Sequence, residues 1–422
     1  MTIDLPEPFV ARRAADVLAR RLSASRAVVV NGPRQSGKTS LLAQLQQERG
    51  GTYLSLDEAT NLRLARTDPG GFVTGFNEPL LIDEVQRGGD PLVLAVKVQV
   101  DRSPKKGRFV LAGSTRFLSE PRLTESLAGR VRFVDLWPLS QGEIDGTHDR
   151  FIDRAFLEPD SIQASTPTIL TRHETFERVV RGGLPEAVLA ASVEDRTDFL
   201  RAYIRALTAK DVRELGDLER VDQLDQIIRL LAARTSTELN VADLAKDLGI
   251  PQTTFRRYLP LFETTYVHHT LPAWSGNNSA KVVRRPKLHF VDSGAAATVL
   301  GVNAAALAKP TAAVAGQLLE TFIAGELARQ LTWSETDARL FHWRHADGRE
   351  VDIVIESADG RVVGIEVKAA VDIDLGALSG LRHLQQRLGD RFVAGFVIHC
   401  GTRVMPAGDR LWTIPTSAVW EW

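Results

Sequence analysis

Cysteine is nearly absent from this chain of 422 residues, because Cys400 is the only one. A single cysteine excludes an internal disulfide and fits a reducing compartment. The chain also has no apolar run near the roughly 18 residues of a membrane helix, and its N-terminus has no secretory apolar segment. We therefore expect a cytoplasmic protein with no membrane partner.

A strong charge of either sign is also missing, since 52 Lys and Arg residues face 53 Asp and Glu residues and the formal net charge is −1. Global charge therefore does not indicate a nucleic-acid partner, which would have to be held by local basic patches. Apolar residues make up 44% and charged residues 25% of the chain, as in globular proteins that dissolve in water. This length exceeds one ordinary core, so we expect about two to four domains.

A glycine-rich loop follows the apolar residues 28–30 and precedes a predicted helix. Residues 32–39 have the spacing of a phosphate-binding loop, whose glycines let backbone N–H groups approach phosphate oxygens. Lys38 would reach the β- and γ-phosphates, and the Thr39 hydroxyl would bind Mg²⁺. The predicted ATP site consists of Gly32, Pro33, Arg34, Gln35, Ser36, Gly37, Lys38, Thr39, Ser40, Asp83 and Ser114.

Two further strands complete this predicted site. Residues 80–82 form an apolar strand that ends at Asp83, which would hold the magnesium shell, and at Glu84, which would polarise the attacking water. Ser114, at the end of the next strand, would sense the γ-phosphate. Arg130 is either an arginine finger or the partner in an ordinary surface ion pair. A finger that acts on a neighbouring subunit would require a homo-oligomer.

The segments GPRQSGKT, LLIDEVQ, LAGST and SLAGR, in this order, resemble the AAA-type ATPases of bacteria and archaea that carry a C-terminal domain of unknown function 4143. The likeness extends over nearly the whole chain and includes RGGLPEAV at residues 181–188. It implies an α/β multidomain fold. The expected parts are a P-loop AAA core in 1–150, a helical lid or connector in 151–220, a winged helix-turn-helix in 221–295 and a restriction-endonuclease-like α/β domain in 300–422.

The middle of the chain has the pattern of a winged helix. Asn240 would cap a short helix that Gly249 ends, and a second helix is predicted over 254–263, followed by a strand over 266–271. Basic side chains of the second helix and the wing suit phosphate contacts. These are Arg256, Arg257, Lys281, Arg284, Arg285 and Lys287. The alternative is a protein-docking module with a solvated basic wing.

The last part of the chain combines a predicted helix, 312–331, with a hairpin of strands 350–356 and 364–370. Glu320 falls among apolar or small residues of the helix, so we expect it on or beside the buried face. Alternation along the two strands places Asp352, Glu366 and Lys368 on one face.

These four residues, in an α-β-β-β-α-β order, resemble the PD-(D/E)xK nuclease superfamily. The resemblance implies that Glu320, Asp352 and Glu366 are ligands of Mg²⁺ or Mn²⁺, and that Lys368 is the catalytic amine. A metal in such a site would activate water and stabilise the phosphodiester transition state. The superfamily also contains inactive binding relatives, and a fold alone does not establish activity.

Two main functions remain open at this point, besides a third role as a docking partner for a toxin or a membrane protein. The first is an ATPase that acts on DNA through the winged helix and a metal-dependent nuclease domain. The second is an ATP-dependent regulatory or assembly protein whose C-terminal domain only binds. ATP and Mg²⁺ are expected in both cases, because both depend on the phosphate loop.

Overall fold

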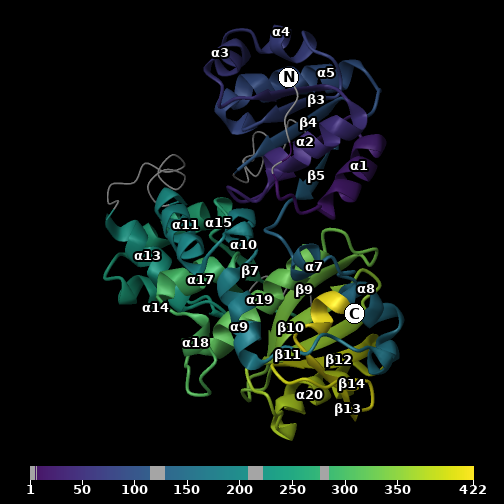
Figure 1. The fold of residues 1–422 in the computed structure, drawn as a ribbon, viewed down its shortest axis with the longest axis vertical. Helices are drawn as coiled ribbons and strands as arrows, with labels where there is room; N and C mark the ends of the chain where they lie inside the picture. Colours follow the sequence, from purple (N-terminus) through teal and green to yellow (C-terminus); the bar gives the residue numbers. More distant parts are fainter. Residues whose placement is uncertain (1–4, 6, 115–128, 208–221, 276–284) are drawn as a thin grey trace. The chain divides into compact units, whose positions relative to one another are not determined.

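The structure is a computed structural model that describes residues 5, 7–114, 129–207, 222–275 and 285–422 (Figure 1). The chain forms two compact units. One contains Met1–Pro138 and Thr264–Tyr266, and the other contains Leu139–Glu263 and Val267–Trp422. Within the described residues, no helix has both the length and the apolar character needed to cross a membrane.

The first unit is built on a parallel sheet with the strand order β2-β3-β4-β1-β5. Its strands are β1 (Ala27–Asn31), β2 (Thr52–Ser55), β3 (Leu80–Asp83), β4 (Phe109–Gly113) and β5 (Val131–Asp135). Three of them, β1, β3 and β4, consist entirely of buried residues, as expected for a parallel sheet covered on both faces. The carboxyl ends of parallel strands meet at one edge, so the loops after β1, β3 and β4 are brought together there.

Helices cover both faces of this sheet. Alternate side chains of the strands pack with α3, α4 and α5 in one apolar cluster, while α1 and α2 lie on the opposite side (Figure 1). The helices are α1 (Ala14–Ala24), α2 (Lys38–Arg49), α3 (Ala59–Thr67), α4 (Pro69–Thr74) and α5 (Gly89–Arg102), with a short 3₁₀ turn, η1 (Val85–Gly88). This α/β/α layering confirms the predicted P-loop core.

The second unit begins with α7 (Gln141–Asp145) and α8 (Phe151–Leu157), followed by η3 (Pro159–Ala164). The ring of Phe151 in α8 lies 5.1 Å from that of Phe396, so α8 packs on the sheet near the C-terminus and not in a separate lid. A helical group follows, and it is joined by two helices from later in the chain. Its members are α9 (Arg172–Arg181), α10 (Pro185–Leu189), α11 (Val193–Ala206), α17 (Ser293–Leu300) and α18 (Ala304–Leu307).

The winged helix has the expected order of elements. These are α13 (Asp222–Ala233), β6 (Thr237–Glu238), α14 (Val241–Asp247), α15 (Gln252–Thr264), β7 (His268–Leu271) and β8 (Lys287–Phe290). The three strands form an antiparallel sheet in the order β6-β8-β7. Asn240 caps α14 as predicted, through a bond from the backbone N–H of Ala242. The second helix begins at Gln252, two residues earlier than the predicted 254.

The C-terminal sheet is mixed and has the order β13-β14-β12-β11-β10-β9. Its elements are α19 (Ala315–Gln330), β9 (Ala338–Arg344), β10 (Glu350–Ser357), β11 (Val362–Lys368), η5 (Leu375–Leu378), α20 (Ser379–Leu388), η6 (Gly389–Arg391), β12 (Phe392–His399), β13 (Met405–Gly408), β14 (Leu411–Pro415) and α21 (Ala418–Glu421). The predicted helices and strands therefore occur in the predicted order, from α19 to β12. Separate apolar clusters, one with side chains of α19 and one with side chains of α20, bury the strands on both faces.

Strict alternation fails in β10. The register between β9 and β10 shifts between Val351 and Val354, and these two side chains pack in the same cluster with α20 residues. Ile353 and Ile355 pack instead in the cluster that contains α19. The extra residue of this bulge lets Asp352 turn toward α19, which the period-two reading could not predict.

Candidate functional site

The phosphate loop connects the end of β1 to the start of α2. Gly37 caps α2 with a φ of 91°, a left-handed conformation that glycine adopts without strain. A Cβ atom on Gly32 would lie only 2.3 Å from the carbonyl oxygen of Leu136, so no other residue fits there. The Lys38 ammonium donates to the carbonyl oxygens of Gly32 (3.0 Å) and Pro33 (2.7 Å). The lysine thus lies folded over the loop in which a phosphate would sit.

The other loop residues surround this lysine. Ser36 is fully buried, Arg34 is half-buried and Gln35 is exposed with a φ of 59°. Ser40 lies in the first turn of α2. These positions agree with a loop whose backbone, more than its side chains, faces the ligand.

The loop is held by an arginine that sequence reasoning missed. Arg12 is buried, and its Nη1 donates to the carbonyl oxygen of Ser36 at 2.6 Å while its Nη2 donates to that of Trp137 at 2.7 Å. It therefore ties the phosphate loop to the segment after β5. No motif spacing marks Arg12, since its partners lie 24 and 125 residues away.

A hydroxyl and a carboxylate meet where Mg²⁺ would be needed. The Thr39 hydroxyl donates to Asp83 Oδ2 at 2.7 Å, and the Tyr53 hydroxyl donates to the same atom at 3.1 Å. The backbone N–H of Glu84 donates to Asp83 Oδ1 at 2.9 Å. The groups that donate to Asp83 are neutral, so they do not cancel the charge of a carboxylate. Carboxylate and hydroxyl oxygens are the ligands that Mg²⁺ prefers, so Thr39 and Asp83 fit a magnesium ion and would hold it. Tyr53 is a further member that the sequence reading missed.

Glu84 and Ser114 are joined by Gln86. The Gln86 amide donates to Glu84 Oε2 and, at 3.0 Å, to Ser114 Oγ, which itself lies 3.3 Å from Glu84 Oε2. Glu84 has a φ of 53°, an uncommon left-handed value for a residue with a side chain. Burial raises the pKa of Glu84 above its ordinary value, Lys38 lowers it and Asp83 raises it. The structure thus brings the predicted base and the predicted sensor together.

Arg130 lies just before β5, and its Nε donates to Asp101 at the C-terminal end of α5. Both side chains are partly exposed, at 35% and 40%. Within this chain Arg130 therefore forms the surface ion pair that was the alternative to an arginine finger. Such a pair between exposed groups contributes little stability, so it could be exchanged for another partner.

The C-terminal carboxylates are arranged differently from the prediction. The Lys287 ammonium, from β8 of the winged helix, donates to Glu320 Oε1 at 2.6 Å and to Asp352 Oδ1 at 3.0 Å. Its side chain is only 9% exposed. Burial would lower the pKa of Lys287, but Glu320 and Asp352 raise it above the ordinary value, so the ammonium is charged at neutral pH. Asp352 also accepts the backbone N–H of Val367 at 2.9 Å.

Glu366 and Lys368 form a second pair, which lies close enough to Asp352 for its charge to act on both groups. Lys368 donates to Glu366 Oε1 at 2.7 Å. Ile365 and Val367 pack with α19 residues, so alternation places Glu366 and Lys368 on the opposite face of β11. Burial, and then repulsion from Asp352, raise the pKa of Glu366 to about 8, while Lys368 lowers it.

This geometry does not fit the predicted metal centre, and the assignment of Glu320, Asp352 and Glu366 as its ligands is corrected. A cation of the chain itself lies between Glu320 and Asp352, and a divalent ion there would meet its repulsion. The described residues include no group of three His, Cys, Asp or Glu side chains arranged to hold a metal. Lys368, the predicted catalytic amine, bonds to Glu366, and its catalytic role stays a prediction.

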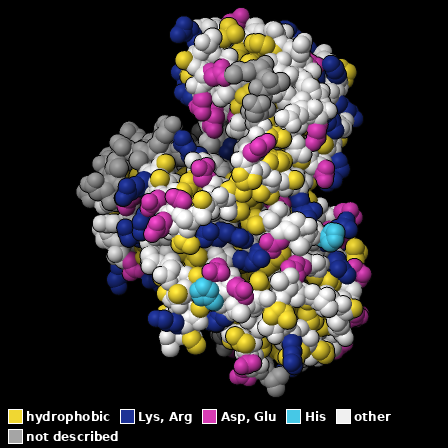
Figure 2. All heavy atoms as spheres, viewed as in Figure 1, with side chains coloured by type: hydrophobic (Ala, Val, Ile, Leu, Met, Phe, Trp, Pro, Cys, Tyr) yellow, Lys and Arg dark blue, Asp and Glu magenta, His cyan; other side chains and the backbone are white. Residues whose placement is uncertain are grey.

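The basic residues of the winged helix divide into two kinds. Arg256 and Arg257 are exposed on α15, and Arg285 is exposed before β8. Lys287 is buried in the pair described above, so its assignment as a nucleic-acid contact is also corrected. Lys281 and Arg284 lie outside the described residues. Figure 2 shows basic and acidic side chains interspersed over one face of the molecule.

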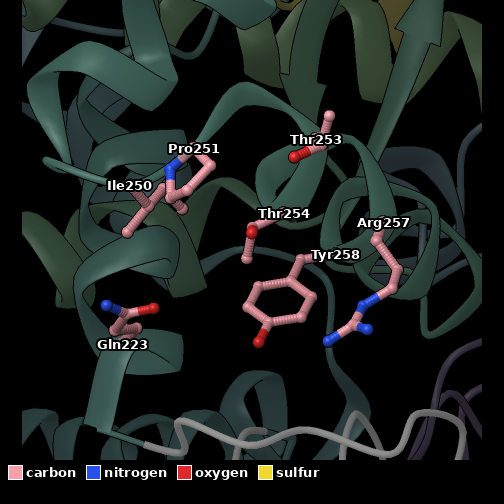
Figure 3. A pocket seen from close by; sticks show the side chains of 7 residues that line it. All are labelled: Gln223, Ile250, Pro251, Thr253, Thr254, Arg257 and Tyr258. Carbon is pink, nitrogen blue, oxygen red and sulfur yellow. The ribbon is translucent and has the colours of Figure 1, made fainter.

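A pocket of about 410 Å³ opens at the start of α15 (Figure 3). It is lined by Gln223, Ile250, Pro251, Thr253, Thr254, Arg257 and Tyr258. The guanidinium of Arg257 lies 5.4 Å from the centre of the Tyr258 ring, which orients the arginine beside the pocket. Gln252 and Thr253 are exposed on the first turn of the same helix. The exposed face of α15 is therefore polar and basic.

Comparison with known proteins agrees with these parts. Three families match, namely an AAA domain over residues 24–145, a domain of unknown function (DUF8612) over 172–306 and another (DUF4143) over 315–419. Uncharacterized proteins of Mycobacterium tuberculosis (Rv2008c) and Mycobacterium bovis (Mb2031c) are each 28% identical over 410 residues, covering 97% of this chain and 84% of the relative.

Two solved structures have a partial likeness to this chain. The Walker-type ATPase PABY2304 of Pyrococcus abyssi has 14% identity and a TM-score of 0.44, covering 71% of this chain and 98% of its own. The RuvB Holliday junction branch migration motor of Thermotoga maritima has 18% identity and a TM-score of 0.32, covering 64% and 93%. Together with the phosphate loop, these matches show that the chain combines an AAA-type P-loop domain in residues 24–145 with a DUF4143 domain in residues 315–419.

Proposed function

We propose that this protein hydrolyses ATP at the phosphate loop and uses the reaction to control a winged helix that contacts DNA, while its C-terminal domain does not cut. The observation that carries the proposal is the bond of 2.7 Å between Thr39 Oγ1 and Asp83 Oδ2, with Glu84 adjacent. This places a hydroxyl, a carboxylate and a candidate base at one edge of the sheet.

Each residue has a separate task in this proposal. Thr39 and Asp83 hold Mg²⁺, which when bound neutralises charge on the phosphates. Lys38 leaves the carbonyl oxygens of Gly32 and Pro33 and binds the phosphate oxygens instead, since both are acceptors for the same ammonium. Glu84 accepts a proton from the attacking water, or orients it.

The Gln86 amide controls when Glu84 can act. It bonds to both Glu84 and Ser114, so a change at Ser114 on binding of the γ-phosphate would alter the position of the base. The raised pKa of Glu84 has a direct consequence. Because its protonated form is inactive as a base, turnover should fall as the pH is lowered through that raised pKa.

Contact with DNA is supported by the exposed face of α15. Arg256 and Arg257 are solvent-accessible, and the second helix of a winged helix-turn-helix is the one that enters a DNA groove. Arginines there would bind phosphates or base edges. The alternative, a protein-docking module, predicts no dependence of DNA affinity on these two arginines.

A catalytically inactive C-terminal domain is favoured by one specific contact, in which the Lys287 ammonium lies between Glu320 and Asp352. The ATP-dependent regulatory or assembly role therefore describes this part of the protein better than a nuclease role does. An association of subunits would be needed if Arg130 exchanges Asp101 for the phosphate of a neighbouring subunit.

The test is the rate of ATP hydrolysis of Glu84→Gln protein. We expect turnover to fall by about 10²–10⁴-fold with ATP binding retained, because the amide keeps the shape of the side chain but cannot accept the proton. Glu48→Gln, an exposed glutamate of α2, is the matched control and should turn over normally. Equal rates for Glu84→Gln and wild type would contradict the proposal.

A further inference from the structure

Three charged groups from three different elements meet in the second unit. Lys287 comes from β8 of the winged-helix sheet, Glu320 from α19 and Asp352 from β10 of the C-terminal sheet. Their side chains are 9%, 10% and 7% exposed. We call this group the Lys287 clasp. It is the one place described here where a charged side chain of the winged helix enters the region predicted to be a nuclease centre.

We propose that Lys287 is a built-in cation that takes the place of a metal, so that the Glu320–Asp352 pair fastens the winged helix to the C-terminal domain. A buried carboxylate pair requires a positive partner, because two like charges repel strongly where water is excluded. The ammonium supplies that partner with distances of 2.6 and 3.0 Å.

A histidine beside the clasp does not supply the positive charge. His289 Nε2 lies 3.8 Å from Glu320 Oε1, and the ring is fully buried. Burial, and then the neighbouring His269 and Lys287, hold the pKa of His289 well below its ordinary value, so this ring is neutral. Lys287 is therefore the group that neutralises the carboxylates.

Backbone bonds next to the clasp join the same two parts. The chain after β7 runs along β9, where the N–H of Trp274 donates to the carbonyl oxygen of His342 at 2.6 Å and the N–H of His342 donates to that of Pro272 at 3.0 Å. His342 Nε2 donates to the carbonyl oxygen of Arg285 at 3.0 Å. The winged helix thus adds a short stretch to the edge of the C-terminal sheet.

Hydroxyl groups extend this contact on the other side of β8. Thr235 Oγ1 lies 2.7 Å from Thr321 Oγ1, next to Glu320 on α19, and it accepts the backbone N–H of Phe290 at 3.0 Å. The clasp is therefore part of a longer interface of hydrogen bonds and ion pairs between the winged helix and the C-terminal domain.

The first experiment measures Mn²⁺ binding by electron paramagnetic resonance in the full chain without nucleotide. An Asp83→Asn background removes the expected metal ligand of the phosphate loop. We expect no bound ion at about 1 mM Mn²⁺, the weak end of oxygen-ligand sites in proteins. A bound ion that is lost on Glu320→Gln would overturn the proposal.

Substitution of Lys287 should allow Mn²⁺ to bind. Lys287→Ala in the same background should gain one Mn²⁺ site, and the further change Glu320→Gln should abolish it, because the vacated carboxylates then need another cation. If Lys287→Ala does not fold, the Mn²⁺ titration of the protein with Lys287 intact still decides the question. A folded Lys287→Ala protein that gains no site would contradict the proposed exchange.

The second experiment measures thermal unfolding. Lys287→Met should lower the Tm by about 10 °C, because it leaves two carboxylates buried without a cation. The triple variant Lys287→Met, Glu320→Gln, Asp352→Asn should recover most of this loss, since its side chains are neutral. Lys309→Met, at an exposed lysine, is the matched control and should not shift the Tm.

The experiments test the Lys287 clasp and the proposed ATPase activity by different measurements. An unchanged Tm in Lys287→Met would overturn the fastening role whether or not the protein hydrolyses ATP. Loss of ATP hydrolysis in Glu84→Gln, in turn, says nothing about Mn²⁺ at Glu320. The two proposals can therefore fail independently.

Discussion

The molecule contains two sites where a carboxylate predicted to bind a metal lies near a lysine, and their bonding differs. At the phosphate loop, the bonds described for Asp83 come from neutral donors, namely two hydroxyls and one backbone N–H. The Lys38 ammonium donates to backbone carbonyl oxygens. At the C-terminal site, the Lys287 ammonium donates to both carboxylates directly.

This difference separates a site prepared for a ligand from a site that is already neutralised. A hydroxyl or an N–H leaves the negative charge of Asp83 in place, so Mg²⁺ can still be attracted. An ammonium removes that attraction and adds its own repulsion toward a divalent ion. The same residue types thus have opposite consequences, and the donor bonded to the carboxylate decides between them.

The largest expected effect is on ATP turnover, and it tests the role of Lys38 at the phosphate loop. Lys38→Met should reduce ATP turnover by about 10²–10³-fold, because a preorganised donor to the phosphates is lost. The free energy of unfolding should change by no more than about 1 kcal/mol, since the carbonyl oxygens of Gly32 and Pro33 that lose this donor are neutral. A steady-state ATPase assay and urea unfolding measure the two quantities.

Lys106→Met is the control for this substitution, because Lys106 is exposed in the same unit. Its turnover should equal that of wild type. If Lys38→Met protein hydrolyses ATP normally, the proposed difference between the Lys38 site and the Lys287 site is wrong.

A third buried carboxylate, Glu326, tests how a positive partner that only partly offsets burial affects the stability of the fold. Glu326 accepts the backbone N–H of Gln141 at 2.8 Å and pairs with Arg329 at 2.9 Å, yet burial raises its pKa to about 7. A raised carboxylate pKa means that the folded state binds the extra proton, so its stability contribution is present below the ordinary pKa and is lost as the pH rises through about 7.

Glu326→Gln should therefore be relatively more stable at pH 8 than at pH 5, by up to about 3 kcal/mol in its difference from wild type. Urea unfolding of both proteins at the two pH values gives this difference. Gln330 lies one turn further along α19 and donates to the carbonyl oxygen of Val419. It is the same in both proteins, so it does not contribute to the measured difference. A pH-independent difference would show that Arg329 keeps Glu326 ionised.

The smallest effect concerns exposed basic groups, in contrast to the buried Lys287. The double variant Arg256→Ala, Arg257→Ala should weaken DNA binding by about 10-fold and reduce the slope of log affinity against log salt by about two. Fluorescence anisotropy with duplex and single-stranded DNA at several salt concentrations measures both. The exposed pair Arg382 and Arg387 on α20, changed in the same way, is the control. Equal losses in both double variants would indicate a general charge effect instead of a contact by α15.

Much of the fold could be predicted because it depends on local patterns. The strand before the phosphate loop is a run of apolar residues, and Asn240 and Gly249 mark the ends of a short helix. The order of elements from α19 to β12 was also predicted correctly. Such signals depend on neighbours within a few residues, where spacing and conformation are directly linked.

The C-terminal site could not be predicted in the same way, because its decisive partner is remote. Lys287 lies 33 residues from Glu320 and 65 from Asp352. In the sequence it is the last of several basic residues, which favours a wing that faces DNA. The bulge in β10 adds a second obstacle, since one extra residue changes the face to which Asp352 points. Arg12 and Tyr53 were missed for the same reason, as both act through contacts between distant segments.

The edge contact between the segment after β7 and β9 has a practical consequence for dissecting this protein. A fragment that starts at residue 300, at the expected domain boundary, would lack Trp274, whose buried ring packs with Phe341 and Trp343. It would also expose the backbone of β9, an outer strand that could then pair with other chains. Such a fragment should aggregate, whereas one that retains the winged helix would keep both its sheet edge and its cation.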